Sequence, residues 1–206
     1  MARHVVVAHY NEDLEWLHEI HSHCPQAHIF VYTKAEPQNI PDASTLPPMA
    51  QLIRLPNVGR ESHTYIHHVL KHYENLPDFT FFTQADPFFH KRTISQLAQT
   101  YLMSKAQFFP PHPPNHLPGN WKCKLEGLRD SGGTIGDWWK FVFGTSYPVR
   151  RNIKTAWNGI FTVHKNRILS RPPAFYERLM QTISHHVNPE EGHFFERTWG
   201  DIFTDL

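Results

Sequence analysis

The chain of 206 residues is 40% apolar and 19% charged, which is enough apolar material for the core of one globular domain. Lys plus Arg number 20 and Asp plus Glu number 19, so the formal charge of +1 argues against bulk electrostatic binding of nucleic acid or anionic membranes. No apolar run approaches the roughly 18 residues of a membrane span, and the amino-terminal run is too short for a signal peptide. The composition predicts one soluble, cytoplasmic domain.

Cysteines and histidines give no strong metal signal. Cys24 and Cys123 are far apart and match neither a disulfide framework nor a Cys-rich metal site, which favours a reducing compartment. The 17 histidines are scattered through the chain, and most are expected to be solvated side chains.

Hydrophobic patterning predicts alternating strands and helices up to residue 86. The predicted strands are 5–8, 29–32, 51–55 and 79–83, and the predicted helices run through 14–20 and 61–73. Beyond them the pattern predicts a helix at 94–102, a Pro-rich loop at 109–119, a strand at 157–163, and helices at 172–184 and 189–203.

The strand at 79–83 ends in Gln84-Ala85-Asp86, which releases one carboxylate at the end of a buried strand. In open α/β sheets, ligands bind in the crevice outside the carboxyl ends of the strands. Asp86 is therefore well placed to hold a substrate or a metal ion.

Several motifs resemble, in order and spacing, those of glycosyltransferases of the GT-A type, which bind nucleotide sugars. These motifs are Ala8-His9-Tyr10-Asn11-Glu12, Asn57-Val58-Gly59, Gln84-Ala85-Asp86-Pro87 and Glu190-Glu191. More specifically, the chain resembles over nearly its whole length the short glycosyltransferase-like proteins classed as domain of unknown function 3431, through segments 57–65, 84–87 and 190–197.

The resemblance implies a single α/β domain over residues 1–206, with a GT-A-like (Rossmann-like), mixed and mainly parallel sheet flanked by helices. Residues 1–90 would be the nucleotide-binding half and 91–206 the acceptor-side half. The implied partners are a nucleotide diphosphate sugar donor and a hydroxyl acceptor such as a glycan. The expected donor contacts are His9, Tyr10, Asn11, Glu12, Asn57, Gly59, Arg60, His63, Gln84, Ala85 and Asp86.

Arg60 follows the glycine turn and opens a helix, so its guanidinium and the free backbone N–H groups could meet phosphate oxygens. The alternative is an ordinary surface arginine that pairs with Glu61. His63 and His67 stand four apart on one helix, a spacing that metal sites use, but they cannot equally face a buried metal. A substrate contact by His63 is therefore favoured over a zinc site.

The expected cofactor is a divalent cation. Where the broad class has Asp-x-Asp, this chain has Gln84-Ala85-Asp86, and Mg²⁺ or Mn²⁺ prefer oxygen ligands. Asp86 together with a diphosphate could hold the ion, with Gln84 offering only a neutral oxygen. The resemblance places His193 near the diphosphate and makes it the candidate second ligand; the alternative is an exposed residue of the helix's first turn.

Glu190 and Glu191 follow Asn188-Pro189 at a predicted helix start, where acids stabilise the macrodipole by roughly 0.3–1 kcal/mol. That structural role would explain both. The resemblance, however, places the acid that deprotonates the acceptor at the start of a late helix. It thus implies Glu191, or else Glu190, as the base of an inverting transfer.

Tryptophans suit sugar rings, although a tryptophan is more often partly buried core. The expected acceptor contacts are Trp157, Asn158, Gly159 and Trp138. Two other functions remain open: a nucleotide- or sugar-binding module without transfer, suggested by the missing first acid, and a metal-dependent hydrolase built on the histidines.

Overall fold

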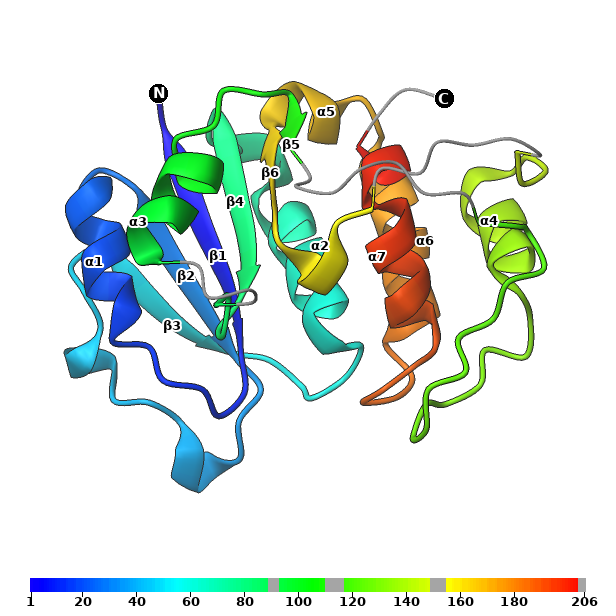
Figure 1. The fold of residues 1–206 in the computed structure, drawn as a ribbon, viewed down its shortest axis with the longest axis horizontal. Coiled ribbons are helices and arrows are strands. Elements are labelled where there is room, and N and C mark those ends of the chain that lie inside the picture. Colours follow the sequence, from blue (N-terminus) through cyan, green and yellow to red (C-terminus); the bar gives the residue numbers. More distant parts are fainter. Residues whose placement is uncertain (89–92, 110–116, 149–154, 204–206) are drawn as a thin grey trace.

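A computed structural model describes residues 1–88, 93–109, 117–148 and 155–203, which contain one six-stranded sheet with helices on both faces (Figure 1). The strands are β1 (Arg3–His9), β2 (His28–Thr33), β3 (Ala50–Arg54), β4 (Phe79–Gln84), β5 (Phe108–Phe109) and β6 (Phe161–His164). The helices are α1 (Trp16–His23), α2 (Arg60–His72), α3 (Ile94–Leu97), α4 (Ile135–Phe143), α5 (Lys165–Leu169), α6 (Pro173–Ile183) and α7 (Glu191–Ile202).

The sheet has the strand order β3-β2-β1-β4-β6-β5. β1 pairs in parallel with β2 and β4, and β2 pairs in parallel with β3, while β6 is antiparallel to both β4 and β5. Crossovers through α1 and α2 make the first four strands parallel. The expected mixed, mainly parallel sheet is confirmed, and the carboxyl ends of β1 to β4 share one edge, at the bottom of the sheet in Figure 1.

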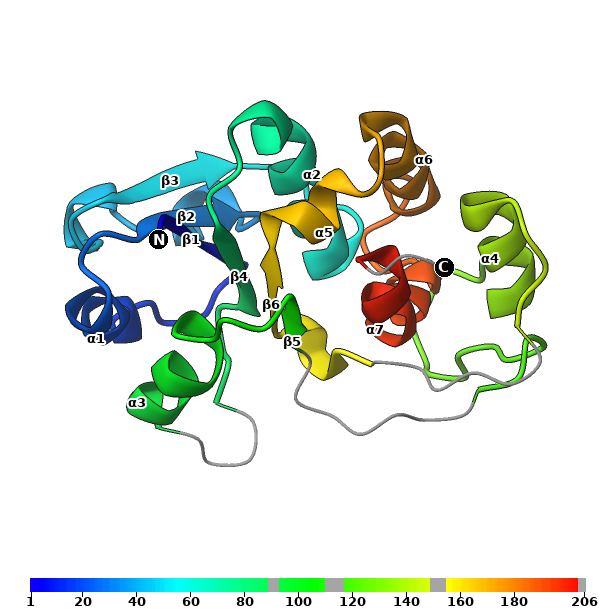
Figure 2. The ribbon, with the colours of Figure 1, turned by 90° about the horizontal axis from the view of Figure 1, so that it is seen from above.

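Alternation along the strands divides the core between the two faces of the sheet. Val5 and Val7 pack with α1 and α3, whereas Val6 packs with the layer that contains α2, α6 and α7. Figure 2 shows α1 and α3 on one side of the sheet and α2 on the other. Among the described helices, none combines the length and the apolar character needed to cross a membrane.

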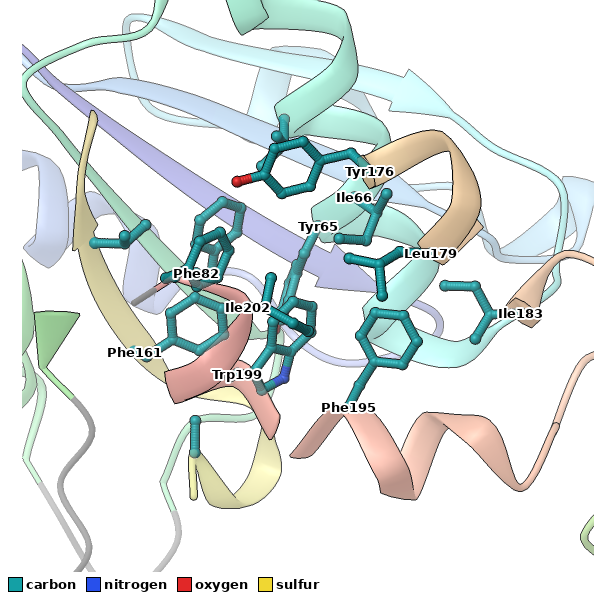
Figure 3. Close-up of a cluster of buried hydrophobic side chains, with 14 of the residues drawn as sticks. Tyr65, Ile66, Phe82, Phe161, Tyr176, Leu179, Ile183, Phe195, Trp199 and Ile202 are labelled. Carbon is teal, nitrogen blue, oxygen red and sulfur yellow. The ribbon is translucent and has the colours of Figure 1, made fainter. Parts of the chain in front are cut away.

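Aromatic rings join the sheet to the carboxyl-terminal helices (Figure 3). The Phe161 ring lies 5.0 Å from that of Trp199, and the Tyr65 ring lies 5.0 Å from that of Phe82, measured between centroids. Large buried rings contribute more apolar area than any other side chains. α7 therefore packs against β6 through Trp199 and against α2 through the Tyr65–Trp199 pair, whose centroids lie 5.9 Å apart, and these contacts set the position of its first turn.

Two predicted boundaries differ from the structure. The strand expected at 157–163 begins only at Phe161, because Asn158 and Gly159 have φ of 59° and 64° and form the 3-10 turn η6 (Trp157–Gly159). α4 has no counterpart among the predicted helices; it begins at a capping box on Thr134. In the predicted Pro-rich loop, Phe109 ends β5, and residues 110–116 lie outside the described part of the chain.

A histidine cluster lies at the opposite, amino-terminal edge of the sheet. His68 of α2 is fully buried, with its Nδ1 2.9 Å from the hydroxyl of Tyr32 and its Nε2 3.1 Å from Nδ1 of His4. Burial, with repulsion from His72 and His28, lowers the pKa of His4 to about 3. Burial likewise holds the pKa of His68 well below its usual value. The folded protein keeps these rings neutral.

We expect the free energy of unfolding to fall as the pH drops below 6.5, because His4 and His68 can be protonated in the unfolded chain but not in the folded one. Each such group contributes a slope of up to about 1.4 kcal/mol per pH unit. Urea denaturation between pH 5 and pH 7 (roughly the range that a histidine titration spans) measures it. His4→Gln should flatten the slope, and His23→Gln, at an exposed position, should not; equal slopes in both variants would contradict the role of the cluster.

Candidate functional site

A pocket of about 220 Å³ opens at the carboxyl edge of the parallel strands, and we call it the strand-end pocket. Its lining comes from the ends of β1, β2 and β4 and from the start of α2: Ala8, His9, Tyr10, Glu12, Lys34, Asn57, Arg60, Glu61 and Gln84. Six of the expected donor contacts thus meet there, namely His9, Tyr10, Glu12, Asn57, Arg60 and Gln84. Two further hollows adjoin the strand-end pocket. One, of about 550 Å³, is also lined by Glu12, and the other, of about 340 Å³, is also lined by Lys34 and Asn57.

Lys34, which sequence reasoning did not single out, is the second cation of the pocket. Its Nζ donates to the carbonyl oxygen of Val58 at 2.6 Å and to that of Arg60. Between those carbonyls, Gly59 and Arg60 have φ of 62° and 50°, a conformation that strains any residue other than glycine. Burial lowers the pKa of Lys34 to about 7, against the opposing charge of Glu61. The amine of Lys34 is therefore only partly protonated near neutral pH.

Arg60 connects the pocket to α7. Its Nη1 lies 3.0 Å from Nε2 of His193, and its Nε lies 3.6 Å from a carboxylate oxygen of Glu61. A guanidinium only donates, so Nε2 of His193 must be the acceptor, and the proton of the ring sits on Nδ1. That nitrogen lies 3.4 Å from Oε2 of Glu196. The imidazole is thus held between Arg60 and Glu196.

Glu61 is a buried acid in the lining of the strand-end pocket. Burial raises the pKa of its carboxyl group, although the neighbouring charge of Arg60 acts in the opposite direction. The other acid in the lining, Glu12, accepts the backbone N–H groups of Tyr10 and Asn11 at 2.7 and 3.0 Å. A Cβ added to Gly159 would lie 3.0 Å from Cγ of Glu61, so part of the expected acceptor segment lies beside this carboxylate.

Five expected donor contacts lie outside the lining: Asn11, Gly59, His63, Ala85 and Asp86. Asn11 is exposed and accepts from the side-chain amide of Asn39 at 3.3 Å, while Ala85 is buried and accepts from the indole of Trp16 at 2.9 Å. Gly59 is the N-cap of α2 and packs closely against His63 and Ile183. His63 is buried, and burial lowers its pKa to about 4, with smaller contributions from Lys34 and His67.

Neither of the expected metal ligands, Asp86 and His193, lines the strand-end pocket. Asp86 is exposed, does not line the pocket, and accepts the N–H of Phe88 at 3.3 Å. His193 has one ring nitrogen on Arg60 and the other facing Glu196. Within the described residues, no group of three or more His, Cys, Asp and Glu side chains is placed to hold a metal ion. The residues as arranged do not fit a preformed cation site.

The two glutamates predicted as base candidates differ in their surroundings. Glu190 accepts hydrogen bonds from the backbone N–H of Cys123 at 2.7 Å and from the N–H and hydroxyl of Ser131 at 3.1 and 2.8 Å, so it ties a loop to α7. Glu191 is buried, and burial raises its pKa. It lines a different cavity of about 350 Å³ between α4, α6 and α7, together with the expected acceptor residue Trp138.

The remaining acceptor predictions concern η6. Asn158 is half-buried in its left-handed conformation, and Gly159 packs against Glu61 and Tyr65. The side chain of Trp157 lies outside what the structure describes.

The amino-terminal half of the chain matches a protein-family model. The model is described as protein of unknown function (DUF3431) and covers residues 5–109. That segment contains every residue that lines the strand-end pocket. No curated protein matches the chain.

Gly59→Ala should lower the free energy of unfolding by more than the roughly 1–2 kcal/mol that a left-handed alanine costs. The added Cβ would lie 2.7 Å from the carbonyl oxygen of Ile183 and 2.7 Å from Cβ of His63. Gly144→Ala is the matched control, because φ there is 72° with nothing within 4 Å of the added carbon. Equal losses in the two variants, measured by urea denaturation, would show that close packing at Gly59 does not matter.

Proposed function

The chain belongs to the DUF3431 family of proteins of unknown function, and we propose that it is a glycosyltransferase that moves a sugar from a nucleotide diphosphate sugar to a hydroxyl acceptor. The observation that carries the proposal is the convergence of Arg60 and Lys34 in a pocket at the carboxyl edge of a parallel sheet. That edge is where open α/β sheets bind ligands. The order of motifs that resembles GT-A glycosyltransferases supports the same assignment, and so does the mainly parallel sheet.

The diphosphate would lie against Arg60 and Lys34, beside the amino end of α2. Helix starts and guanidinium groups both favour phosphate oxygens. The pocket of about 220 Å³ is smaller than the roughly 300–1,000 Å³ of sites for whole small molecules. The adjoining hollows and the exposed ring of Tyr10 leave room for the nucleoside and the sugar.

In the transfer step, the acceptor oxygen bonds to the anomeric carbon while the bond from that carbon to the diphosphate oxygen breaks. The bonding electrons leave with the nucleoside diphosphate, and the acceptor proton passes to a carboxylate. We assign that carboxylate to Glu61, because it lines the pocket, has a raised pKa and adjoins Gly159. Arg60 and Lys34 offset the charge that develops on the leaving group.

The transfer step uses no metal ligand of the chain, because Asp86 and His193 lie outside the pocket lining and both ring nitrogens of His193 face other side chains. A divalent cation held by Asp86 and the donor's own diphosphate stays a prediction, and every assay below is run with and without Mn²⁺. A binding module that recognises the donor without transfer is the second candidate, which the position of Asp86 outside the lining favours.

We expect one of the UDP, GDP, CDP or dTDP sugars to bind and to raise the melting temperature. Arg60→Gln should weaken that binding by roughly tenfold to a hundredfold, since it removes a charge-assisted hydrogen bond to phosphate. Arg167→Gln, in α5 at the other end of the sheet, is the matched control. Isothermal titration in buffers of different ionisation enthalpy should also show proton uptake near pH 7, because a bound anion raises the pKa of Lys34.

Two results would contradict donor binding at this site. One is that no donor shifts the melting temperature with or without Mn²⁺, and the other is that Arg60→Gln and Arg167→Gln bind the donor with equal affinity. Inorganic pyrophosphate is the control for binding of any anion of this kind. It should bind more weakly than the complete donor.

Glu61→Gln should lower transfer, or hydrolysis of the donor, by about a hundredfold or more while donor binding persists, because it removes the group that takes the proton. Glu74→Gln, an exposed acid outside the lining, is the control for the loss of one negative charge. If Glu191→Gln abolished turnover and Glu61→Gln did not, the base would lie in the other cavity. Donor binding with no turnover by the unmodified protein would support the binding module.

A further inference from the structure

The cavity of about 350 Å³ between α4, α6 and α7, which we call the helix cavity, differs in charge from the strand-end pocket. Its lining includes two carboxylates, those of Glu191 and Asp137, together with His185, and no lysine or arginine among the described residues. Trp138, Phe141 and Phe194 supply aromatic surface. The volume suits a small molecule.

Glu191 gives the clearest indication of a missing partner. Its side chain is more than nine-tenths buried, and its Oε2 has no hydrogen-bond partner among the described residues. Burial raises its pKa; Glu190 and Asp130 act in the same direction, and His185 opposes them. A buried carboxylate oxygen without a partner is costly, and a cationic donor relieves that cost better than a neutral one.

The aromatic lining favours the same kind of ligand. The rings of Trp138 and Phe194 lie 6.0 Å apart, and Phe141 is 54% exposed. Ammonium groups are attracted to aromatic faces, most strongly to tryptophan. Asp137 adds a second negative charge, since hydrogen bonds from the hydroxyl and N–H of Thr134 lower its pKa.

Compensation of the helix dipole is an incomplete account of these acids. Asp137 and Glu191 lie in the first turns of α4 and α7, where a negative charge stabilises a helix. An exposed side chain would do so equally well. Dipole compensation does not explain why Glu191 is buried with one oxygen unpaired.

We propose that the helix cavity binds a small molecule that carries a protonated amine, with the ammonium against Glu191 and the body of the molecule on Trp138. This inference does not depend on sugar transfer. It concerns a site whose lining, from Ser131 to Phe194, lies outside the segment matched by the family model.

The test compares benzylamine with benzyl alcohol, which match in shape and differ in charge at pH 7, by isothermal titration of the full chain. We expect benzylamine to bind at least tenfold more tightly. Glu191→Gln should remove that preference, and Glu177→Gln, an exposed acid on α6 outside the lining, should preserve it.

Phe141→Lys is a second variant, because it places a competing amine at an exposed position of the lining without disturbing the core. It should weaken benzylamine binding by tenfold or more while the melting temperature stays close to that of the parent. No benzylamine binding at millimolar concentration, equal affinity for the alcohol, or a preference that survives both variants would overturn the proposal. None of these results bears on donor binding in the strand-end pocket, which is measured separately.

Discussion

The buried amine of Lys34 organises the region on which the strand-end pocket depends. Attached just beyond β2, it reaches the carbonyls of Val58 and Arg60, which lie on either side of a left-handed turn. Without this amine, both carbonyls would lose a hydrogen bond, and the strain at Arg60 would be unopposed. One side chain therefore fixes where α2 begins and where its arginine stands.

The same interaction makes the site responsive to charge. With a pKa of about 7, Lys34 is only partly protonated near neutral pH, because burial opposes its charge. An anion in the pocket favours the protonated form, and a protonated amine donates more strongly to the two carbonyls. Binding of an anion would therefore be thermodynamically linked to the order of the turn.

A series of charged groups joined by the imidazole of His193 continues from this turn into α7. Arg60 lies between Glu61 and His193, and His193 faces Glu196, which also accepts from Arg197 at 3.2 Å. Burial alone would raise the pKa of Glu196, but the hydrogen bond with His193 and the charge of Arg197 together lower it. Buried ions tolerate low dielectric only with opposite partners, so this chain of contacts constrains α2 and α7 to one relative position.

The sequence predicted the parallel sheet and much of the strand-end pocket because both follow from local patterns: buried runs, a glycine turn, and polar residues where a strand ends. Lys34 was not predicted because no motif surrounds it in the sequence. Its role depends on carbonyl groups that are distant in the sequence and close only in the fold. The predicted pairing of Asp86 with His193 stays a prediction, and the surroundings of His193 show a limit of the same kind. A motif does not reveal that Arg60 and Glu196 already engage both nitrogens of the ring.

The strand-end pocket and the helix cavity meet at one contact. A Cβ added to Gly192 would lie 3.3 Å from Cδ of Arg60, so the glycine leaves the space that lets Arg60 pack against the first turn of α7, next to Glu191. Lys34 and Arg60 line the strand-end pocket, and Glu191 and Asp137 line the helix cavity. The two sites therefore favour ligands of opposite charge, because each repels the ion that the other attracts. The first turn of α7 thus places one residue beside each site: Gly192 packs against Arg60, and Glu191 lines the helix cavity.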